Sequence, residues 1–275
     1  MALHGHLTLV CGLDDRGRSS LRRQSFRAPM HISKPHLDEG GALVVNVVNP
    51  TAGLLADDVI DCDVRVEAGA QLLLTSPSAN RAHRAKQGWA ELRQEFHVAA
   101  GGFLDVWPEL FIPQGGAEYR QRSVLRVERG GELLYFESLA PGRVASGEAF
   151  AYGSLSWEID LYVAEDYVAR ERCRLDPTDE SVQTLRGAFP TAYYASALLV
   201  SDRLKPESPC WERLHDAHEE QAWIGCSRLA AGAWSVKAVA ATSVLLRSKL
   251  ALVRSEIYRE LGRPEPGLRR VAGVG

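Results

Sequence analysis

The sequence has 275 residues, of which 45% are hydrophobic, and its 32 Lys and Arg against 35 Asp and Glu give a formal net charge of −3. A chain of this length can bury a substantial core, as one large all-β domain or as two average domains. The balanced charge gives no electrostatic basis for binding nucleic acid or an anionic membrane. The apolar runs are far shorter than the roughly 20 residues of a membrane helix, and the N-terminus lacks the pattern of a signal peptide. We therefore expect a cytoplasmic protein, with neither nucleic acid nor membrane as a partner.

The cysteines indicate a reducing compartment. They are odd in number, scattered, and without a C-x-x-C pair: Cys11, Cys62, Cys173, Cys210 and Cys226. This pattern favours reduced thiols over a disulfide framework or a structural zinc site.

The first distinctive element is a turn between two strands that begins at Asn49. Pro50 fixes its own φ and pushes Asn49 into an extended conformation, so the first strand ends there. Gly53 can adopt a positive φ, and the apolar pair Leu54 and Leu55 predicts a packed turn. Four carboxylates follow within seven residues, at the start of the second strand: Asp57, Asp58, Asp61 and Asp63.

A short phrase then recurs three times. It reads VEAGAQLL over 66–73, VAAGGFLD over 98–105 and VERGGELL over 127–134, with spacings of 32 and 29 residues. Each copy places two small residues between β-like runs, which is typical of a hairpin. Repeats of this size predict stacked layers of sheet, as in a short solenoid or an irregular β-helix. The alternative is a set of similar hairpins in an ordinary sandwich.

The last 120 residues mix element types. Alternation predicts strands over 154–163 and 167–175, whereas the polar stretch 177–187 is expected to be a loop. The segments that follow fit a strand or a helix over 193–200, a helix over 211–223, and paired strands over 224–229 and 233–240. The clearest helix runs from Ser243 to Leu261, because its apolar residues recur at steps of three and four and Gly262 follows it.

These elements predict a mainly β fold of stacked β-hairpin layers, irregular and β-helix-like, with one or two C-terminal helices. We expect a single domain over residues 1–275, β-rich over 1–176 and mixed α/β over 177–275.

The sequence contains none of the common catalytic motifs. No phosphate-binding loop and no nucleophile elbow is present. The segment Gly142 to Glu148 is a glycine-bracketed turn that carries Arg143, Gly147 and Glu148. We interpret it as a structural turn with an ion pair, and a catalytic loop is the alternative.

Metal ligands are weakly indicated. His4 with His6, and His215 with His218, would each share one face of an element, but neither pair has the second pair that a tetrahedral site needs. Acidic residues beside a turn are usually solvated, yet a transient path for a cation would leave the same faint pattern. The candidate contacts for such a cation are Asp57, Asp58, Asp61, Asp63 and His83.

Several motifs in order resemble the UreD (also called UreH) urease accessory proteins. They are Ser25-Phe26-Arg27-Ala28-Pro29, Asn49-Pro50-Thr51-Ala52-Gly53-Leu54-Leu55, Leu74-Thr75-Ser76-Pro77-Ser78-Ala79, Trp107-Pro108-Glu109, Gly142-Arg143-Val144-Ala145-Ser146-Gly147-Glu148, Arg172-Cys173-Arg174-Leu175-Asp176 and Leu261-Gly262-Arg263-Pro264. The family pattern that begins at Asn49 and ends at Asp58 is Asn-Pro-Thr-Gly-Gly-Leu-Leu-Gly-Gly-Asp. Here Ala52, Ala56 and Asp57 replace three of its glycines while Gly53 and Asp58 remain, which is typical of a divergent member.

The resemblance implies a non-enzymatic scaffold that helps deliver nickel to the urease active site. Family members are similar in their β-rich, β-helix-like architecture. The partners implied are a UreF-type accessory protein, a UreG-type GTPase bound through UreF, and apo-urease. A nickel passage through the protein interior is also implied, with Ni²⁺ bound transiently and no tightly bound cofactor. If the acidic strand touches this passage, Asp58→Ala should impair nickel transfer more than stability.

A second hypothesis comes from a different class of protein. A β-rich hydrolase or metal-dependent enzyme could use Arg143 and Glu148 together with the carboxylates between Asp57 and Asp63. It predicts turnover that is lost on Glu148→Ala or Asp58→Ala while folding survives.

Overall fold

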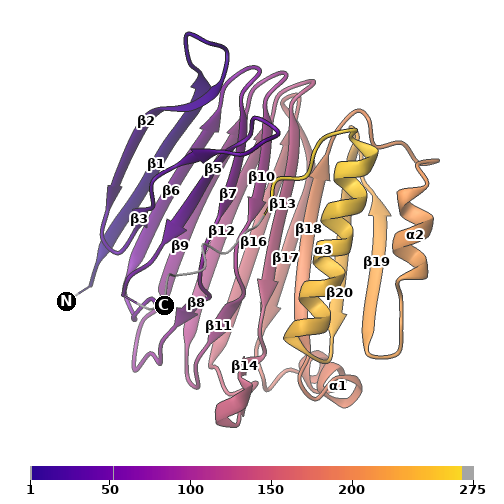
Figure 1. Cartoon of the computed structure of the whole chain (residues 1–275). Helices are drawn as coiled ribbons and strands as arrows, with labels where there is room; N and C mark the ends of the chain where they lie inside the picture. The colour runs from indigo at the N-terminus through magenta and orange to yellow at the C-terminus, as the bar shows by residue number, and fades with distance from the viewer. Residues whose placement is uncertain (1, 52, 268–275) are drawn as a thin grey trace, which may run out of the picture.

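Two facing β-sheets form the body of the molecule, and the computed structural model describes residues 2–51 and 53–267 (Figure 1). The strands of the first sheet are β1 (His4–Leu13), β2 (Ser19–Arg27), β6 (Val59–Val66), β9 (Ala90–Val98), β12 (Glu118–Val127), β16 (Ser154–Val163) and β17 (Asp166–Leu175). They lie in the order β17-β16-β12-β9-β6-β1-β2. The five central strands are parallel to one another, and the two edge strands are antiparallel to their neighbours.

The second sheet has eleven strands. They are β3 (His31–Ile32), β4 (His36–Leu37), β5 (Leu43–Val48), β7 (Gln71–Thr75), β8 (Asn80–Ala82), β10 (Phe103–Trp107), β11 (Phe111–Pro113), β13 (Glu132–Leu139), β18 (Tyr193–Val200), β19 (Ala222–Arg228) and β20 (Ala233–Ala240). Its main path runs β19-β20-β18-β13-β10-β7-β5-β3. The remaining elements are β14 (Gly142–Arg143), η1 (Val144–Ser146), β15 (Glu148–Ala149), α1 (Glu180–Ala188), α2 (Cys210–Asp216) and α3 (Ser243–Glu260).

The three repeated phrases stack in register. Val66, Val98 and Val127, the first residues of the three copies, are paired neighbours in the first sheet. Gln71, Phe103 and Glu132, the sixth residues of the same copies, are paired neighbours in the second sheet. The predicted β-rich, stacked, solenoid-like architecture is therefore confirmed.

The turn inside each repeat is a corner between sheets, and in this detail the hairpin interpretation was wrong. The strands before and after the turn belong to different sheets, so each pairs with the next repeat and not with its own partner across the turn. Gly69, Gly101 and Gly130 have φ values of 75°, 72° and 78°, which glycine adopts at little cost. A glycine turn reverses the chain in both cases, so local composition does not distinguish a hairpin from a corner.

The corners pack so closely that a single methyl group matters. A Cβ atom on Gly131 would lie 2.9 Å from the carbonyl oxygen of Ala99 in the preceding layer. We expect Gly131→Ala to lower the free energy of unfolding by about 1 to 2 kcal/mol, because the backbone must shift to admit the methyl group. Urea unfolding followed by tryptophan fluorescence measures this change.

Gly187→Ala is the matched control. A Cβ on Gly187 meets no atom within 4 Å, and this glycine lies in helix α1. Alanine there should raise stability by up to about 1 kcal/mol, since it has the higher helix propensity. Equal losses in both variants would contradict the close packing of the corners.

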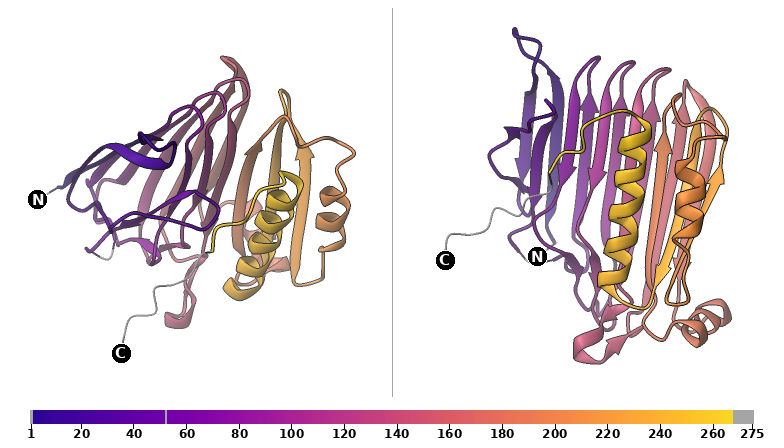
Figure 2. Two further views of the ribbon diagram at one scale, coloured as in Figure 1. Left: turned by 45° about the horizontal axis from the view of Figure 1, so that its top comes forward. Right: turned by 45° about the vertical axis from the view of Figure 1, so that its right-hand side comes forward.

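Besides a smaller cluster that includes Leu54, Tyr119 and Trp157, the hydrophobic core of the described residues has two main parts. One lies between the sheets, where inward-facing residues of both sheets meet, as Leu9, Val64 and Leu133 do. The other lies between the second sheet and the helices, where Leu134 and Val253 are fully buried. Figure 2 shows α3 and α2 against the end of this sheet formed by β18, β20 and β19.

The C-terminal helix agrees with the sequence. Helix α3 spans Ser243–Glu260, and the Thr242 side chain accepts a hydrogen bond from the Leu245 amide at its start. Two segments differ. The stretch 177–187, expected to be a loop, contains α1, whose Val182 is buried. The helix expected over 211–223 is only the short α2, because β19 begins at Ala222 and pairs with β20.

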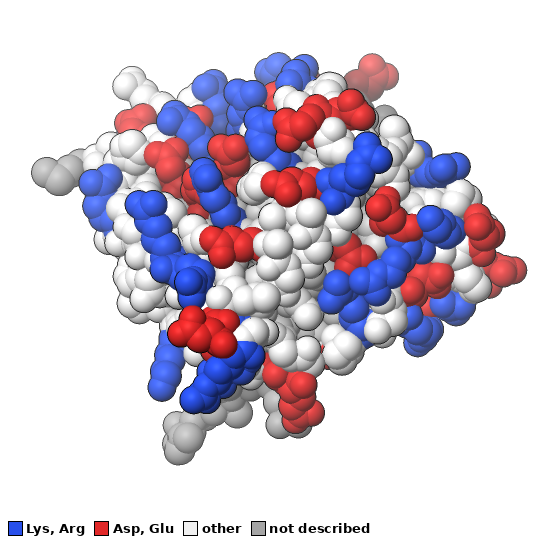
Figure 3. Space-filling model, turned by 90° about the horizontal axis from the view of Figure 1, so that it is seen from above, with Lys and Arg blue, Asp and Glu red and all other residues white. Residues whose placement is uncertain are grey.

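Acidic and basic side chains are interspersed on the exposed side of the first sheet. Ion pairs link neighbouring positions at distances of 2.9, 3.2 and 3.0 Å: Arg93–Glu91, Arg126–Glu95 and Arg172–Glu158. Figure 3 shows a similar mixture of both signs over the top of the molecule. Among the helices in the described residues, none combines the length and apolar composition needed to cross a bilayer.

Candidate functional site

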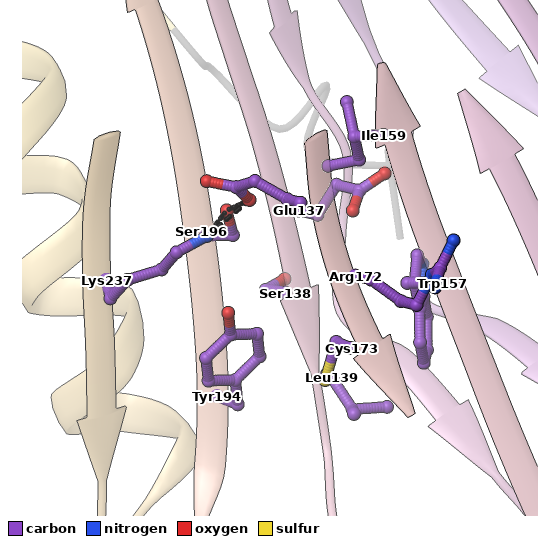
Figure 4. Close-up of a pocket in the computed structure, with 11 residues that line it drawn as sticks. Glu137, Ser138, Leu139, Trp157, Ile159, Arg172, Cys173, Tyr194, Ser196 and Lys237 are labelled. Carbon is purple, nitrogen blue, oxygen red and sulfur yellow. Dashed lines mark hydrogen bonds and ion pairs between the residues drawn. The ribbon is translucent and has the colours of Figure 1, made fainter. Parts of the chain in front are cut away.

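A cavity of about 200 Å³ lies between the two sheets, near β17, the edge strand of the first sheet, and its mostly apolar lining includes several charged groups (Figure 4). Its charged lining comes from three strands: Glu137 on β13, Glu171 on β17 and Lys237 on β20. Strand alternation explains how Glu137 enters the interior. Tyr135 and Glu137 are two residues apart on β13, so both face the first sheet. Leu134, the residue before Tyr135, faces the helices on the other side.

Hydrogen bonds organise the charged groups of this cavity. The two carboxylate oxygens of Glu171 accept hydrogen bonds from Ser235 and Ser196, each at 2.8 Å. The Lys237 ammonium group donates to Glu171 Oε2 and lies 2.7 Å from Ser196 Oγ. Lys237 therefore joins the edge of the first sheet to two strands of the second sheet.

A second cavity of about 140 Å³ adjoins the first, and Glu137, Ser138 and Trp157 line both. Its lining continues with polar side chains that bond to one another. Tyr119 donates to Gln121 at 2.7 Å, and Gln94 donates to the Tyr135 hydroxyl at 3.3 Å. Seven residues of the sequence motifs also line it: Asn49, Leu54, Leu74, Thr75, Ser76, Pro108 and Glu109. The two cavities together lead from the edge of the first sheet to these motif residues.

Burial controls the acidity of the cavity. It raises the pKa of the Glu137 carboxyl to about 7, and the charge of Glu171 adds to this rise. Hydrogen bonds from Tyr135 and Gln121 and the charge of Lys237 act in the opposite direction. Burial also raises the pKa of the Cys173 thiol to about 11, so this cysteine is protonated at neutral pH and is a poor metal ligand.

The turn beginning at Asn49 is packed, as predicted, and it carries the chain from β5 in the second sheet to β6 in the first. Asn49 Oδ1 accepts hydrogen bonds from the amide and the hydroxyl of Thr51, at 3.0 and 2.7 Å. Gly53 has a φ of 150°, and a Cβ there would lie 2.8 Å from both the Arg81 carbonyl oxygen and His83 Nε2.

The two leucines of this turn differ in exposure. Leu54 is buried, pairs with β8 and lines the second cavity, whereas Leu55 is 53% exposed. Ala52 is one of the departures from the family pattern, and it lies outside the described residues.

The four carboxylates after the turn do not converge. Asp61 bonds to His4 at 2.6 Å and Asp63 to Arg65 at 3.1 Å, both on the exposed side of the first sheet. Asp57 has a φ of 67°, and Asp58 is buried. Within the described part of the chain, no three His, Cys, Asp or Glu side chains lie close enough together to hold a metal ion.

Asp58 supports the turn from inside. Its two oxygens accept hydrogen bonds from the amides of Leu3 and Leu55, each at 2.8 Å. The sequence predicts that Asp58→Ala impairs nickel transfer more than stability, whereas these contacts indicate a main effect on stability. We now expect Asp58→Ala to lower the free energy of unfolding by about 1 to 2 kcal/mol, because two amides lose their acceptor. Urea unfolding of this variant beside Asp63→Ala, whose carboxylate is on the surface, measures the difference, and equal stability of the two would contradict it.

Arg143 and Glu148 form an ion pair across the turn that ends at Gly147, whose φ is 74°. Glu148 Oε2 accepts hydrogen bonds from Arg143 Nε at 2.7 Å and from the Gly115 amide at 3.0 Å. The bond from Arg143 lowers the pKa of the Glu148 carboxyl to about 2. A general base works best with a pKa near the working pH, so this geometry suits a structural turn better than catalysis.

Comparison with known proteins now identifies the family. The family model described as UreD urease accessory protein matches residues 3–272. The chain belongs to the UreD family. A urease accessory protein UreD from Opitutus terrae is 37% identical over 98% of this chain and 100% of its own length. One from Deinococcus radiodurans is 30% identical over 94% of this chain and 91% of its own length.

Membership in the UreD family supports a role in urease maturation, and it implies association with urease and its other accessory proteins. The relatives are named as accessory proteins of urease, which indicates a helper role. The sequence motifs include residues that line both cavities, among them Asn49 and Cys173, but they do not include Glu137, Glu171 or Lys237. The available signal was that Glu137 follows the apolar run from Leu133 to Phe136.

Proposed function

We propose that this UreD-family chain is a non-catalytic scaffold that passes Ni²⁺ toward apo-urease through the space between its two sheets. In this proposal it binds a UreF-type accessory protein, which connects it to a UreG-type GTPase, and it contacts apo-urease directly. GTP hydrolysis is then supplied by the partner.

The pair of adjoining cavities is the observation that carries the proposal. Their walls combine motif residues such as Asn49 and Glu109 at one end with the carboxylates of Glu137 and Glu171 at the other. Carboxylate, hydroxyl and amide oxygens are suitable contacts for a hydrated divalent cation. The lack of three converging metal ligands in the described residues favours brief contacts over storage, as a passage requires.

The enzyme hypothesis has less support from the geometry. Glu148 is held by Arg143 as an ion pair with a low carboxyl pKa, and Asp58 is a buried acceptor of two backbone amides. Glu148 bonds to Arg143 and Gly115, and Asp58 bonds to Leu3 and Leu55. These contacts indicate structural roles for both carboxylates.

The test is nickel delivery by a variant whose interior carboxylates are neutral. Glu137→Gln/Glu171→Gln keeps the side-chain volumes but removes both charges. It is co-expressed with urease and the other accessory proteins in a strain that lacks its own UreD. We expect urease activity and nickel per urease, measured by mass spectrometry of the purified enzyme, to fall at least tenfold.

The matched control is Glu91→Gln/Glu95→Gln, which removes two carboxylates from the exposed side of the first sheet. It should activate urease as the wild type does. Full activation by the interior variant would exclude these carboxylates from the route. Failure of the wild-type chain to bind a UreF-type protein or to restore urease would defeat the scaffold proposal as a whole.

A further inference from the structure

The ammonium group of Lys237 is a positive charge that bonds to Glu171 and Ser196 in the cavity lining. We propose that Lys237 is a resident counter-cation that a divalent ion must displace, so that it makes the cavity selective for divalent over monovalent cations. This inference rests on the proposed passage of Ni²⁺ and assigns to Lys237 the role of a specificity-determining residue.

The direction of the Lys237 side chain is the first observation. Lysine side chains at a surface usually place their ammonium group in water. Here the side chain is 40% exposed, yet its ammonium group turns inward to Glu171 Oε2 and to Ser196 Oγ, 2.7 Å away (Figure 4). The Glu171 side chain that receives it is only 18% exposed. The ammonium is thus bonded to groups of the cavity lining, while part of the side chain remains exposed.

The groups around the ammonium are the second observation. Glu171 presents two carboxylate oxygens, Ser196 presents a hydroxyl, and the carboxylate of Glu137 lines the same cavity. These are oxygen donors of the kind that bind a partly hydrated divalent cation. The ammonium therefore bonds to the same oxygen atoms that a passing ion would use.

Charge decides which ions can replace it. A free monovalent cation would bring the same charge as the ammonium, would lose hydration on entry, and would compete with a group that is tethered to the protein. A divalent cation doubles the Coulomb attraction to the same carboxylates, and it can keep most of its hydration shell while it contacts them. The ammonium can then move outward, because the Lys237 side chain is already partly exposed.

A purely structural ion pair is the competing explanation. Lys237 joins β20 to β17, and this contact would hold the sheets together at the open edge whether or not ions pass. The two explanations differ in one respect, because only a displaceable cation leaves Glu171 when a divalent ion arrives.

Chemical labelling of the wild-type chain, in complex with its UreF-type partner, separates the two. An N-hydroxysuccinimide ester acylates exposed lysine amines, and peptide mass spectrometry gives the rate at Lys237, with the exposed Lys205 as internal reference. We expect Ni²⁺ to raise the rate at Lys237 at least threefold relative to Lys205, and Na⁺ at equal ionic strength to leave it unchanged. An equal rate with both ions would overturn the inference.

Variants test it independently. Lys237→Met keeps the length of the stem without the charge, so calorimetry should show Ni²⁺ binding about tenfold more tightly than to the wild type. Lys237→Arg, which keeps the charge, and Lys205→Met should retain the wild-type affinity. Unchanged affinity in Lys237→Met would remove Lys237 from ion selection. A wild-type chain that binds no Ni²⁺ in the same experiment would instead defeat the proposed passage itself.

Discussion

The Asp105→Ala variant is expected to lose about 3 to 5 kcal/mol of unfolding free energy, because it leaves the buried guanidinium of Arg254 without its main partner. Asp105 on β10 and Arg254 on α3 are both completely buried, and Arg254 Nε donates to Asp105 Oδ2 at 2.8 Å. The Tyr258 hydroxyl donates to the same oxygen at 2.8 Å. Urea unfolding followed by circular dichroism measures the loss, and helix α3 should lose its attachment to the second sheet first.

Two further variants give this prediction its controls. Arg247→Met removes an ion pair from the same helix, but Arg247 is 53% exposed and its partner is Glu109, so the cost should be below about 1 kcal/mol. The double variant Asp105→Leu/Arg254→Met removes both buried charges and should recover most of the stability lost in Asp105→Ala. A double variant as unstable as the single one would show that packing, and not the unpaired charge, causes the loss.

The stacked architecture was predictable because its signal is local and repeated. The phrase that starts at Val66, Val98 and Val127 carries its glycine at the same place each time, and this regularity gives the register of both sheets. The helix α3 was predictable for a similar reason, since the apolar stripe from Leu246 to Ile257 lies within one segment.

Pairing between distant segments was not predictable. A glycine turn can end a hairpin or a corner between sheets, and only the neighbouring layers decide which of them forms. The same limit applies to the buried pair of Asp105 and Arg254, which are 149 residues apart. Neither residue differs in its local sequence from a solvent-exposed charge.

The candidate site was predictable only where family motifs line it, as Asn49, Pro108 and Glu109 do in the second cavity and Cys173 does in the first. Glu137 was missed because a glutamate that follows an apolar run does not show which face of its strand it occupies. Its companions Glu171 and Lys237 belong to other strands, so their meeting depends on the fold.

We expect the unfolding free energy of the wild type to fall, relative to that of Glu137→Gln, as the pH rises. The pKa of Glu137 is raised to about 7 in the folded chain, above its ordinary value of 4.5. A carboxyl with a raised pKa in the folded state contributes stability that is fully present below about pH 4.5 and is lost as the pH rises through 7. Between pH 5 and pH 8 the wild type should therefore lose about 2 kcal/mol more than Glu137→Gln, since the cavity leaves this group in partial contact with solvent.

The physical cause is the ionisation of a carboxyl group inside the cavity. Burial and the charge of Glu171 on β17 oppose ionisation, while Lys237 on β20 and the hydrogen bonds from Tyr135 and Gln121 favour it. Urea unfolding at each half unit of pH, for the wild type and Glu137→Gln in parallel, gives the difference directly. Glu148→Gln is the control, because the pKa of Glu148 is lowered from 4.5 to about 2 and its contribution is lost only as the pH falls below about 4.5, so its difference from the wild type should stay constant between pH 5 and pH 8. If the difference between the wild type and Glu137→Gln stays constant from pH 5 to pH 8, Glu137 ionises as an ordinary surface carboxyl does, and the cavity does not control its charge.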